Sequence, residues 1–186
     1  MKKLLVLALV ISLVVPLVAA DKEYATQGVV ELGGTAGFSS ISTKADVKGA
    51  EAVTTTMLSL APEVGYFVAD NISLGAVLNI SSVKYEDEDA ITTTGISLAP
   101  TYVFKGESAY PFVGLLLGLS STKDGDETTN ITTYGLRGGV KVKLGDNGLL
   151  NLGLSYTAGS SKSDEEGAIA DKLGIIQLGA GFSLYL

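Results

Sequence analysis

Apolar residues alternate with small or polar residues along most of the chain, and this period of two constrains the fold more than any other feature. It is typical of β-strands, whose successive side chains point to opposite faces of a sheet. Seven segments show it clearly, with apolar or glycine residues at the even numbers: residues 28–38, 58–66, 72–80, 96–104, 134–144, 150–156 and 176–186. No window after residue 20 holds about 20 consecutive apolar residues, which a membrane-spanning helix would need.

The two faces of these segments differ in charge. None of the 37 even-numbered positions is charged or is Ser, Thr, Asn or Gln. The odd-numbered positions carry five charged side chains among many small and polar ones: Glu31, Glu63, Arg137, Lys141 and Lys143. A soluble sandwich or barrel would place its apolar set inside and its charged set outside. A face without charges suits lipid, and a small polar face suits a narrow lumen, so the pattern predicts a membrane β-barrel.

The first twenty residues have a separate role. Lys2 and Lys3 precede an apolar run that ends in Val18-Ala19-Ala20, which is the pattern of a cleaved secretory signal peptide. The alternative is an uncleaved N-terminal anchor, although Pro16 would disturb a permanent spanning helix. We therefore expect a signal peptide at residues 1–20, a barrel domain at residues 21–186 and localisation in the cell outer membrane.

A repeat of about forty residues predicts the number of strands. Four polar segments begin with paired serines, at residues 39, 81, 120 and 160. Two strands with one long and one short connection fit such a unit, so four units predict eight strands. The fold class is therefore all-β, an eight-stranded antiparallel up-and-down transmembrane β-barrel. Long loops are expected near residues 39–52, 82–91, 121–130 and 158–172, and short turns near residues 69–71, 105–109 and 145–148.

Finer expectations concern aromatic residues, prolines and one ambiguous strand. Interfacial girdles are predicted on the turn side from Tyr24, Tyr66, Tyr102, Phe104 and Phe112, and on the loop side from Phe38, Tyr134 and Tyr156. Pro62 and Pro100 each lack a ladder donor, so a bulge or bend is expected at both. The strand at residues 110–120 is apolar on both faces, and its orientation stays open. Inward leucines would seal the lumen, whereas inward Gly114 and Gly118 would loosen it.

Composition excludes several kinds of chemistry. The chain has no His and no Cys, so imidazole bases, thiolate nucleophiles, disulfides and ordinary zinc sites are excluded. Its net charge of −7 argues against binding to nucleic acid, which needs a basic surface. We expect no enzymatic activity and no cofactor.

Four charged residues are candidates for a site in the lumen: Glu31, Glu63, Arg137 and Lys141. An eight-stranded barrel has an interior that side chains can fill, and buried charges are tolerated only when paired. The favoured interpretation is a structural network of salt bridges that plugs the lumen. The alternatives are a polar gate or proton path and, much less favoured, a pair of catalytic carboxylates of the glycosidase kind.

The predicted loops are acidic, with 13 acidic residues against six lysines. Asp124, Asp126, Glu127 and the run at residues 86–89 are weak candidates for binding a hard cation such as Ca²⁺, because neither segment has the spacing of a known calcium loop. The alternatives are a solvated, mutually repelling surface and diffuse bridging through divalent cations to anionic lipopolysaccharide.

Several motifs resemble the small outer-membrane β-barrel domain family, the group of OmpX, OmpA-barrel and opacity-type proteins. They are Gly33-Gly34, the stretch from Pro62 to Asn71, Tyr110-Pro111-Phe112-Val113-Gly114 and the C-terminal residues 181–186. The resemblance covers nearly all of residues 21–186 and implies a Gram-negative cell envelope. It also implies that Gly181, Phe182, Leu184 and Leu186 form a signal for the barrel-assembly machinery, although that signal usually ends in an aromatic residue.

These observations predict an integral outer-membrane protein without enzymatic activity. We expect a structural or surface-interaction role through acidic extracellular loops, with a plugged polar lumen. Expected partners are outer-membrane lipid and lipopolysaccharide, the assembly machinery during biogenesis and an external surface partner, and we expect a monomer. The alternative is a small porin-like channel that passes ions or small solutes; adhesion is a third role, implied by the resemblance.

Overall fold

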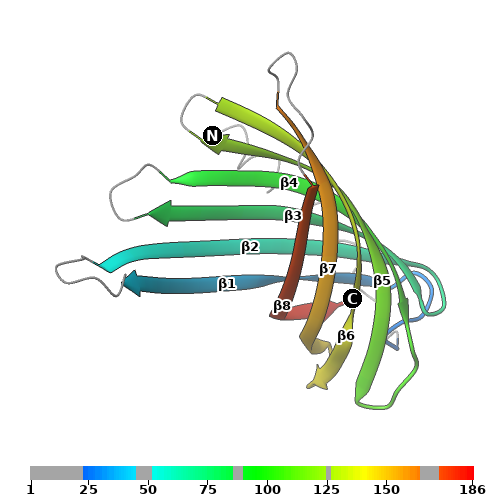
Figure 1. The fold of residues 1–186 in the computed structure, drawn as a ribbon. Helices are drawn as coiled ribbons and strands as arrows, with labels where there is room; N and C mark the ends of the chain where they lie inside the picture. The colour runs from blue at the N-terminus through cyan, green and yellow to red at the C-terminus, as the bar shows by residue number, and fades with distance from the viewer. Residues whose placement is uncertain (1–22, 45–51, 86–89, 125–126, 164–171) are drawn as a thin grey trace, which may run out of the picture.

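The computed structural model describes residues 23–44, 52–85, 90–124, 127–163 and 172–186. They form eight strands in one closed antiparallel barrel, in which each strand pairs with its neighbours in the chain and β1 pairs with β8 (Figure 1). The strands are β1 (Val30–Lys44), β2 (Ala52–Ala69), β3 (Ile72–Tyr85), β4 (Ile91–Val103), β5 (Ala109–Asp124), β6 (Glu127–Leu144), β7 (Gly148–Ser163) and β8 (Lys172–Tyr185). The predicted fold class is confirmed. The described ranges contain no helix long and apolar enough to cross a membrane.

The strands are longer than a membrane crossing requires. They contain 13 to 18 residues, against about 9–11 for a spanning strand. They therefore extend into the segments expected to be long loops, and that expectation was wrong at the loop boundaries. Backbone pairing continues beyond the apolar alternation, through Thr- and Ser-rich residues such as Thr54 and Thr94.

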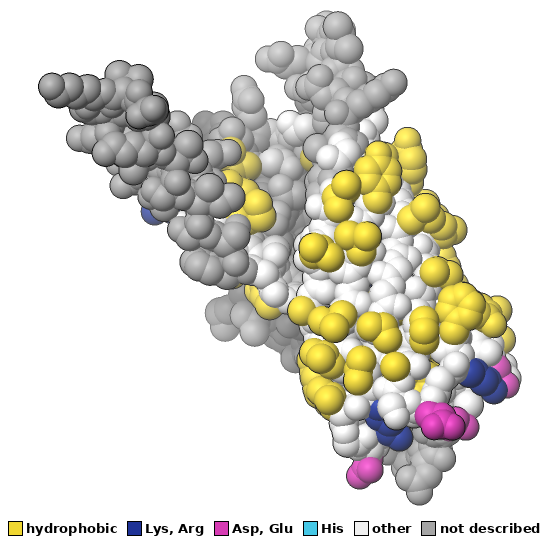
Figure 2. All heavy atoms as spheres, turned by 60° about the horizontal axis from the view of Figure 1, so that its bottom comes forward, with side chains coloured by type: hydrophobic (Ala, Val, Ile, Leu, Met, Phe, Trp, Pro, Cys, Tyr) yellow, Lys and Arg dark blue, Asp and Glu magenta, His cyan; other side chains and the backbone are white. Residues whose placement is uncertain are grey.

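The outer wall is apolar, as the alternation predicts. The large even-numbered side chains of β2, β3, β4, β6, β7 and β8 are mostly exposed, and Leu98, for example, is 62% exposed. Figure 2 shows these apolar side chains over the outside of the wall, with charged side chains gathered at one end. Odd-numbered residues of these strands line the interior.

In β5 the odd-numbered residues face outward, whereas in the strands above the even-numbered residues do. This resolves the orientation that the sequence left open. Its odd-numbered residues Val113, Leu115, Leu117 and Leu119 are exposed. The pairs Leu98–Leu117 and Leu117–Tyr134 join even to odd numbers across both neighbouring ladders, and directly paired residues share a face. Gly114, Leu116 and Gly118 consequently face inward.

Two of the predicted girdle residues face the interior instead. Tyr66, Tyr102, Phe104, Tyr134 and Tyr156 are exposed as expected, whereas Tyr24 and Phe112 are buried. Phe112 turns inward because of the phase of β5, and Tyr24 lies in a segment that precedes the barrel wall. The side chain of Phe38 lies outside the described residues.

A bulge or bend was expected at Pro62 and Pro100, and neither position shows the register shift of a bulge. The β2–β3 register continues unchanged from Leu60–Ile80 to Glu63–Val77, and the β4–β5 register continues past Pro100. A proline removes one donor, and here the strands keep their alignment across that gap. The irregularity in the β2–β3 ladder lies instead between Phe67 and Ala69, next to the turn.

The barrel closes through a short ladder. Strand β1 pairs with β8 over five residue pairs, from Glu31–Tyr185 to Thr35–Gly181. Residues 36–44 of β1 and 172–180 of β8 continue beyond it, and Figure 1 shows β8 diverging there from β1. We call the end of the barrel with the short connections the turn end and the opposite end the loop end.

Candidate functional site

An apolar cluster of buried side chains lies inside the barrel at the turn end. Its members come from the segment before β1 and from β2, β4, β5, β7 and β8: Tyr24, Ala25, Val29, Phe67, Val103, Tyr110, Phe112, Leu149 and Tyr185. The alternation had suggested a small polar interior throughout, and for this end of the barrel that expectation was wrong. Phe67, Val103, Leu149 and Tyr185 stand at odd numbers, too few in each strand to change the pattern, and Tyr110 and Phe112 lie in the strand whose orientation the sequence left open.

Residues 23–29 form a stopper segment across the turn end. The Gly28 amide donates to the Phe67 carbonyl at 2.8 Å, and the Phe67 amide donates to the Val29 carbonyl at 2.9 Å. The Asn71 amide donates to the Ala25 carbonyl at 2.8 Å. Asn71 has φ +67°, a conformation that Asn tolerates at a tight turn.

Tyr24 is the central side chain of the apolar cluster. Its ring centroid lies 5.4 Å from that of Phe67, 4.9 Å from that of Tyr110 and 5.1 Å from that of Tyr185. Its hydroxyl donates to Glu31 Oε2 at 2.8 Å. Burial raises the pKa of the Tyr24 hydroxyl well above its usual value, and the Glu31 carboxylate raises it further, so the phenol stays protonated.

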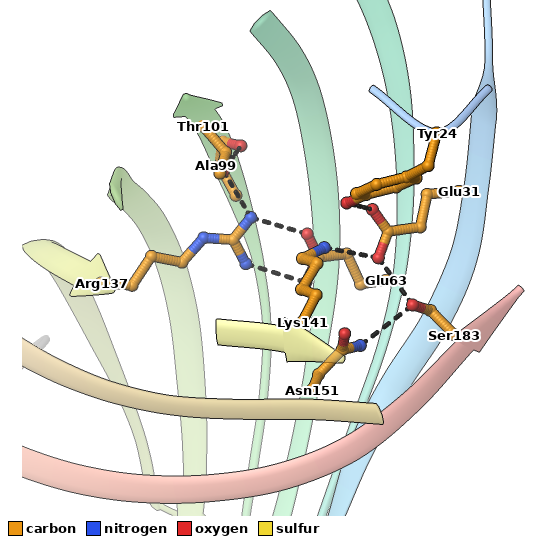
Figure 3. Close-up of polar contacts among 9 residues, drawn as sticks. All are labelled: Tyr24, Glu31, Glu63, Ala99, Thr101, Arg137, Lys141, Asn151 and Ser183. Carbon is orange, nitrogen blue, oxygen red and sulfur yellow. Dashed lines mark hydrogen bonds and ion pairs between the residues drawn. The ribbon is translucent and has the colours of Figure 1, made fainter. Parts of the chain in front are cut away.

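The first ion pair contacts Tyr24 through both of its members, Glu31 and Lys141. Lys141 Nζ is 2.5 Å from Glu31 Oε1, and the two side chains are only 9% and 10% exposed. The Ser183 hydroxyl also donates to Glu31 Oε1, at 2.7 Å, and Asn151 Nδ2 donates to Ser183 Oγ at 3.0 Å (Figure 3). Four strands thus hold one buried carboxylate: β1, β6, β7 and β8.

The second ion pair crosses the lumen beside the first. Arg137 donates to both carboxylate oxygens of Glu63, at 2.8 Å and 2.7 Å, and to Thr101 Oγ1 at 2.7 Å (Figure 3). The Thr101 hydroxyl in turn donates to the Ala99 carbonyl. This bidentate pair is more accessible than the first, with side chains 14% and 26% exposed.

Room for the Arg137 guanidinium comes from an inward glycine. A Cβ on Gly114 would lie 2.8 Å from Thr101 Oγ1 and 3.3 Å from Arg137 Nε. The Phe112 ring lies beside both cations, 6.0 Å from Arg137 Cζ and 5.4 Å from Lys141 Nζ. We call the two ion pairs, Glu31–Lys141 and Glu63–Arg137, the ion-pair layer; in it each charge faces an opposite charge.

A cavity of about 340 Å³ lies against the ion-pair layer. Glu31, Glu63, Arg137 and Lys141 line it. The rest of its lining includes small and polar side chains such as Thr35, Ser59, Asn79, Ser155 and Gln177.

The four lumen residues proposed from the sequence therefore meet as two pairs, Glu31 with Lys141 and Glu63 with Arg137. Tyr24, Thr101, Asn151 and Ser183 complete the network, and sequence reasoning missed them. Ser183 and Asn151 stand at odd-numbered strand positions, and this alternation could have indicated that they face the lumen. Tyr24 precedes the alternation and gave none.

The other candidate residues are placed as follows. The side chains of Asp124 and Glu127 and all of Asp126 lie outside the described residues, as do residues 1–22. Among the groups that are described, no three carboxylates gather as a metal site. Of the proposed assembly signal, Phe182 and Leu184 face outward, Gly181 pairs with Thr35, and Leu186 exchanges backbone hydrogen bonds with Val30.

Comparison with known proteins shows the fold. No family model matches the chain, and no curated protein matches it significantly. Among solved structures, the chain resembles the outer membrane protein AlkL in lipid bilayers, with a TM-score of 0.52, 17% identity and coverage of 90% of this chain and 94% of that one. It also resembles OprG from Pseudomonas aeruginosa (TM-score 0.51, 19% identity, 87% and 97% covered) and the Neisserial surface protein NspA (0.50, 19%, 85% and 97%). The chain therefore has the architecture of the small outer-membrane barrels.

Proposed function

We propose, from this small outer-membrane barrel fold, that the protein is an integral outer-membrane barrel with a closed lumen and no enzymatic activity. Its role is structural and interactive, exerted through the acidic loops at the loop end. The observation that carries the closed lumen is the stack of two barriers at the turn end, the apolar cluster and the ion-pair layer. The absence of His and Cys from the chain supports a non-enzymatic role, because no imidazole or thiolate is available.

Conductance tests the closed lumen. Single-channel recording on the refolded protein in a planar bilayer is expected to show no resolvable current, with a heat-modifiability gel to establish that the barrel has folded. Reproducible openings by the folded wild type would contradict the proposal.

Membrane insertion is tested by placing a charge on either face of β4. Leu98→Lys puts a cation on the exposed outer wall and is expected to cost about 2–4 kcal/mol if it lies near the midplane. The matched control is Ser97→Lys, at the adjacent inward position, where Asn79 donates to the Ser97 hydroxyl. Its lipid penalty is expected to be smaller. Equal loss of folding into vesicles would argue against a lipid-facing outer wall.

Loop chemistry supports the interactive part of the proposal. The acidic run at residues 86–89 would attract divalent cations that bridge to anionic lipopolysaccharide. Replacing these four residues with Gln or Asn is expected to reduce Mg²⁺-dependent binding to lipopolysaccharide vesicles. Glu107→Gln, at an exposed turn-end position, is the control. Unchanged Mg²⁺ dependence in the loop variant would count against the bridging role.

The second candidate function is a small channel for ions or solutes. The cavity favours it, because it reaches the ion-pair layer, and the Glu63–Arg137 pair is the more accessible of the two pairs. If this candidate holds, the wild type conducts and Glu63→Gln changes the conductance. A closed wild type and a closed Glu63→Gln variant would argue against it.

A further inference from the structure

The stopper segment is separate from the barrel wall. The first strand of the barrel begins at Val30, and residues 23–29 belong to none of the eight strands. The segment is attached to the β2–β3 turn by side chains as well as by backbone. The Gln27 amide donates to Asp70 Oδ1 at 2.9 Å, and Gln27 Nε2 donates to the Val68 carbonyl at 3.1 Å. Displacing this segment would leave the described strand ladders of the barrel intact.

Tyr24 reaches from this segment to five strands. Its ring meets aromatic rings of β2, β5 and β8, its hydroxyl binds Glu31 of β1, and Lys141 Nζ of β6 lies 6.0 Å from the ring centroid. These contacts join sectors of the wall that are far apart around the barrel. Tyr24 as a whole is only 3% exposed.

The barrier between the cavity and the turn end is thin at this point. Glu31 and Lys141 line the cavity, and the same two side chains contact Tyr24. At this point the Glu31–Lys141 pair lies between the cavity and the Tyr24 ring, which belongs to the apolar cluster; Figure 3 shows Glu31 and Lys141 beside Tyr24. A packed apolar interior leaves few voids as large as a water molecule. We therefore expect a packed aromatic ring to exclude water and ions better than a pair of charged side chains does.

Tyr24 also spans the shortest ladder of the barrel. It contacts Tyr185 of β8 and Glu31 of β1, which themselves form one of the five β1–β8 pairs. The Ser183–Glu31 hydrogen bond crosses the same ladder. The ring thus contributes to closing the barrel where backbone pairing is least extensive.

We infer that residues 23–29 act as a removable stopper. Tyr24 is the positioning residue that keeps the turn end of the lumen closed, and its contacts with both strands also stabilise the pairing of β8 with β1. This inference rests on the proposed closed state. It makes the block depend on the stopper segment, because Tyr24 belongs to the apolar cluster and also contacts Glu31 and Lys141 of the ion-pair layer. Withdrawal of the segment converts the closed barrel into a narrow pore without unfolding it.

Three variants of the full chain test the stopper by planar-bilayer recording. Tyr24→Ala is expected to open the barrel and give currents that the wild type lacks. Tyr24→Phe keeps the ring and loses only the hydroxyl, so it is expected to stay closed. Tyr66→Ala removes an outward aromatic residue of β2 and is also expected to stay closed. A folded Tyr24→Ala protein that remains closed would overturn the inference.

A second variant and a sided assay cover the case in which Tyr24→Ala does not fold. Asp70→Ala removes the exposed carboxylate that accepts from Gln27 and is expected to give intermittent openings. Because the chain has no cysteine, Ala61→Cys provides a unique thiol in the cavity lining. An impermeant thiol reagent on the turn side is expected to label it only when Tyr24→Ala or Asp70→Ala is also present. Equal labelling with and without those changes would contradict the inference.

The two proposals fail in different ways. A conducting wild type would overturn the closed lumen, and the stopper would still stand if Tyr24→Ala raised the current further while Tyr24→Phe did not. A closed wild type with a closed, folded Tyr24→Ala variant would leave the proposed function in place and overturn the stopper.

Discussion

The two ends of this barrel are built from the same strands, yet they differ in how the strands pair and in what fills the interior. At the turn end, backbone pairing of β1 with β8 coincides with a packed apolar cluster and with two ion pairs. Toward the loop end β8 diverges from β1, and the interior holds a cavity with small side chains on its walls. Strand pairing and interior packing therefore change together along the barrel: both are more extensive at the turn end.

Exposure along β8 follows this difference. Phe182 and Leu184, beside the β1 ladder, are 49% and 46% exposed, whereas Ile176 and Leu178, beyond it, are 74% and 84% exposed. An unpaired backbone group in hydrocarbon costs several kcal/mol. We therefore expect the divergent half of the β1–β8 junction to be in contact with water. The contrast between the ends can be tested by paired substitutions that place the same change in each region.

The largest contrast is expected between the two ion pairs. Glu31→Ala leaves Lys141 without its carboxylate in a nearly inaccessible site, and breaking such a pair costs about 3–5 kcal/mol. Glu63→Ala is expected to cost less, because water can reach the more accessible Arg137. Urea unfolding of both variants in phospholipid vesicles measures the difference. Equal losses would mean that the two pairs share one environment.

Inward leucines give the next contrast. Leu149→Ala empties a fully buried position in the turn-end cluster, and such truncations cost about 2–5 kcal/mol. Leu116→Ala removes the same atoms from the lining of the cavity, where the leucine packs less completely, and is expected to destabilise the barrel less. The same unfolding experiment applies. A larger loss at Leu116 would show that the cavity is packed more tightly than this structure has it.

Glycines beside the β1–β8 junction give a smaller contrast. A Cβ on Gly33 would clash with Ser183 Cβ and would lie 2.6 Å from the Phe182 carbonyl oxygen, so Gly33→Ala is expected to cost about 1–3 kcal/mol by overpacking. A Cβ on Gly179 would meet only Thr35 Cγ2, at 3.7 Å, so Gly179→Ala is expected to be close to neutral. If Gly179→Ala proved as costly as Gly33→Ala, the two strands would have to approach closely along their whole length.

The smallest expected effect is the pH dependence contributed by Tyr24. Burial and the Glu31 carboxylate raise the pKa of its hydroxyl, so the folded state keeps the proton that the unfolded chain loses above pH 10.0. The unfolded state then binds fewer protons, and stability falls as pH rises, by at most about 1.4 kcal/mol per pH unit. Tyr24→Phe lacks this contribution, so its unfolding free energy is expected to fall less steeply above pH 10.0. Parallel curves for wild type and variant would contradict the burial of a protonated Tyr24.

The main expectations about the fold could be reached from local patterns. The uncharged even face and the repeat of about forty residues predicted eight strands and their sidedness, because both depend on residues close together in the chain. The orientation of the strand at residues 110–120 could not be predicted in this way. Its two faces are equally apolar, so only pairing with Leu98 and Tyr134 on the neighbouring strands sets its phase.

The lumen was accessible to the same reasoning only in part. Alternation placed Glu31, Glu63, Arg137 and Lys141 on the inward face, and the requirement for paired buried charges suggested a network. Which carboxylate meets which cation depends on strand register and shear around the barrel. Glu63 and Arg137 are 74 residues apart, and Glu31 and Lys141 are 110 apart.

By itself, then, the sequence determined the strand architecture, the apolar outer surface and the charges assigned to the interior, because each follows from the period of two along a single strand. Tertiary structure decided where aromatic side chains pack across the interior. Tyr24, Phe67, Tyr110 and Tyr185 come from distant parts of the chain and form one cluster only after the barrel has brought β2, β5 and β8 around one axis. Contacts across a lumen leave no periodic trace in any one strand, which is the physical reason that the stopper emerged only from the folded molecule.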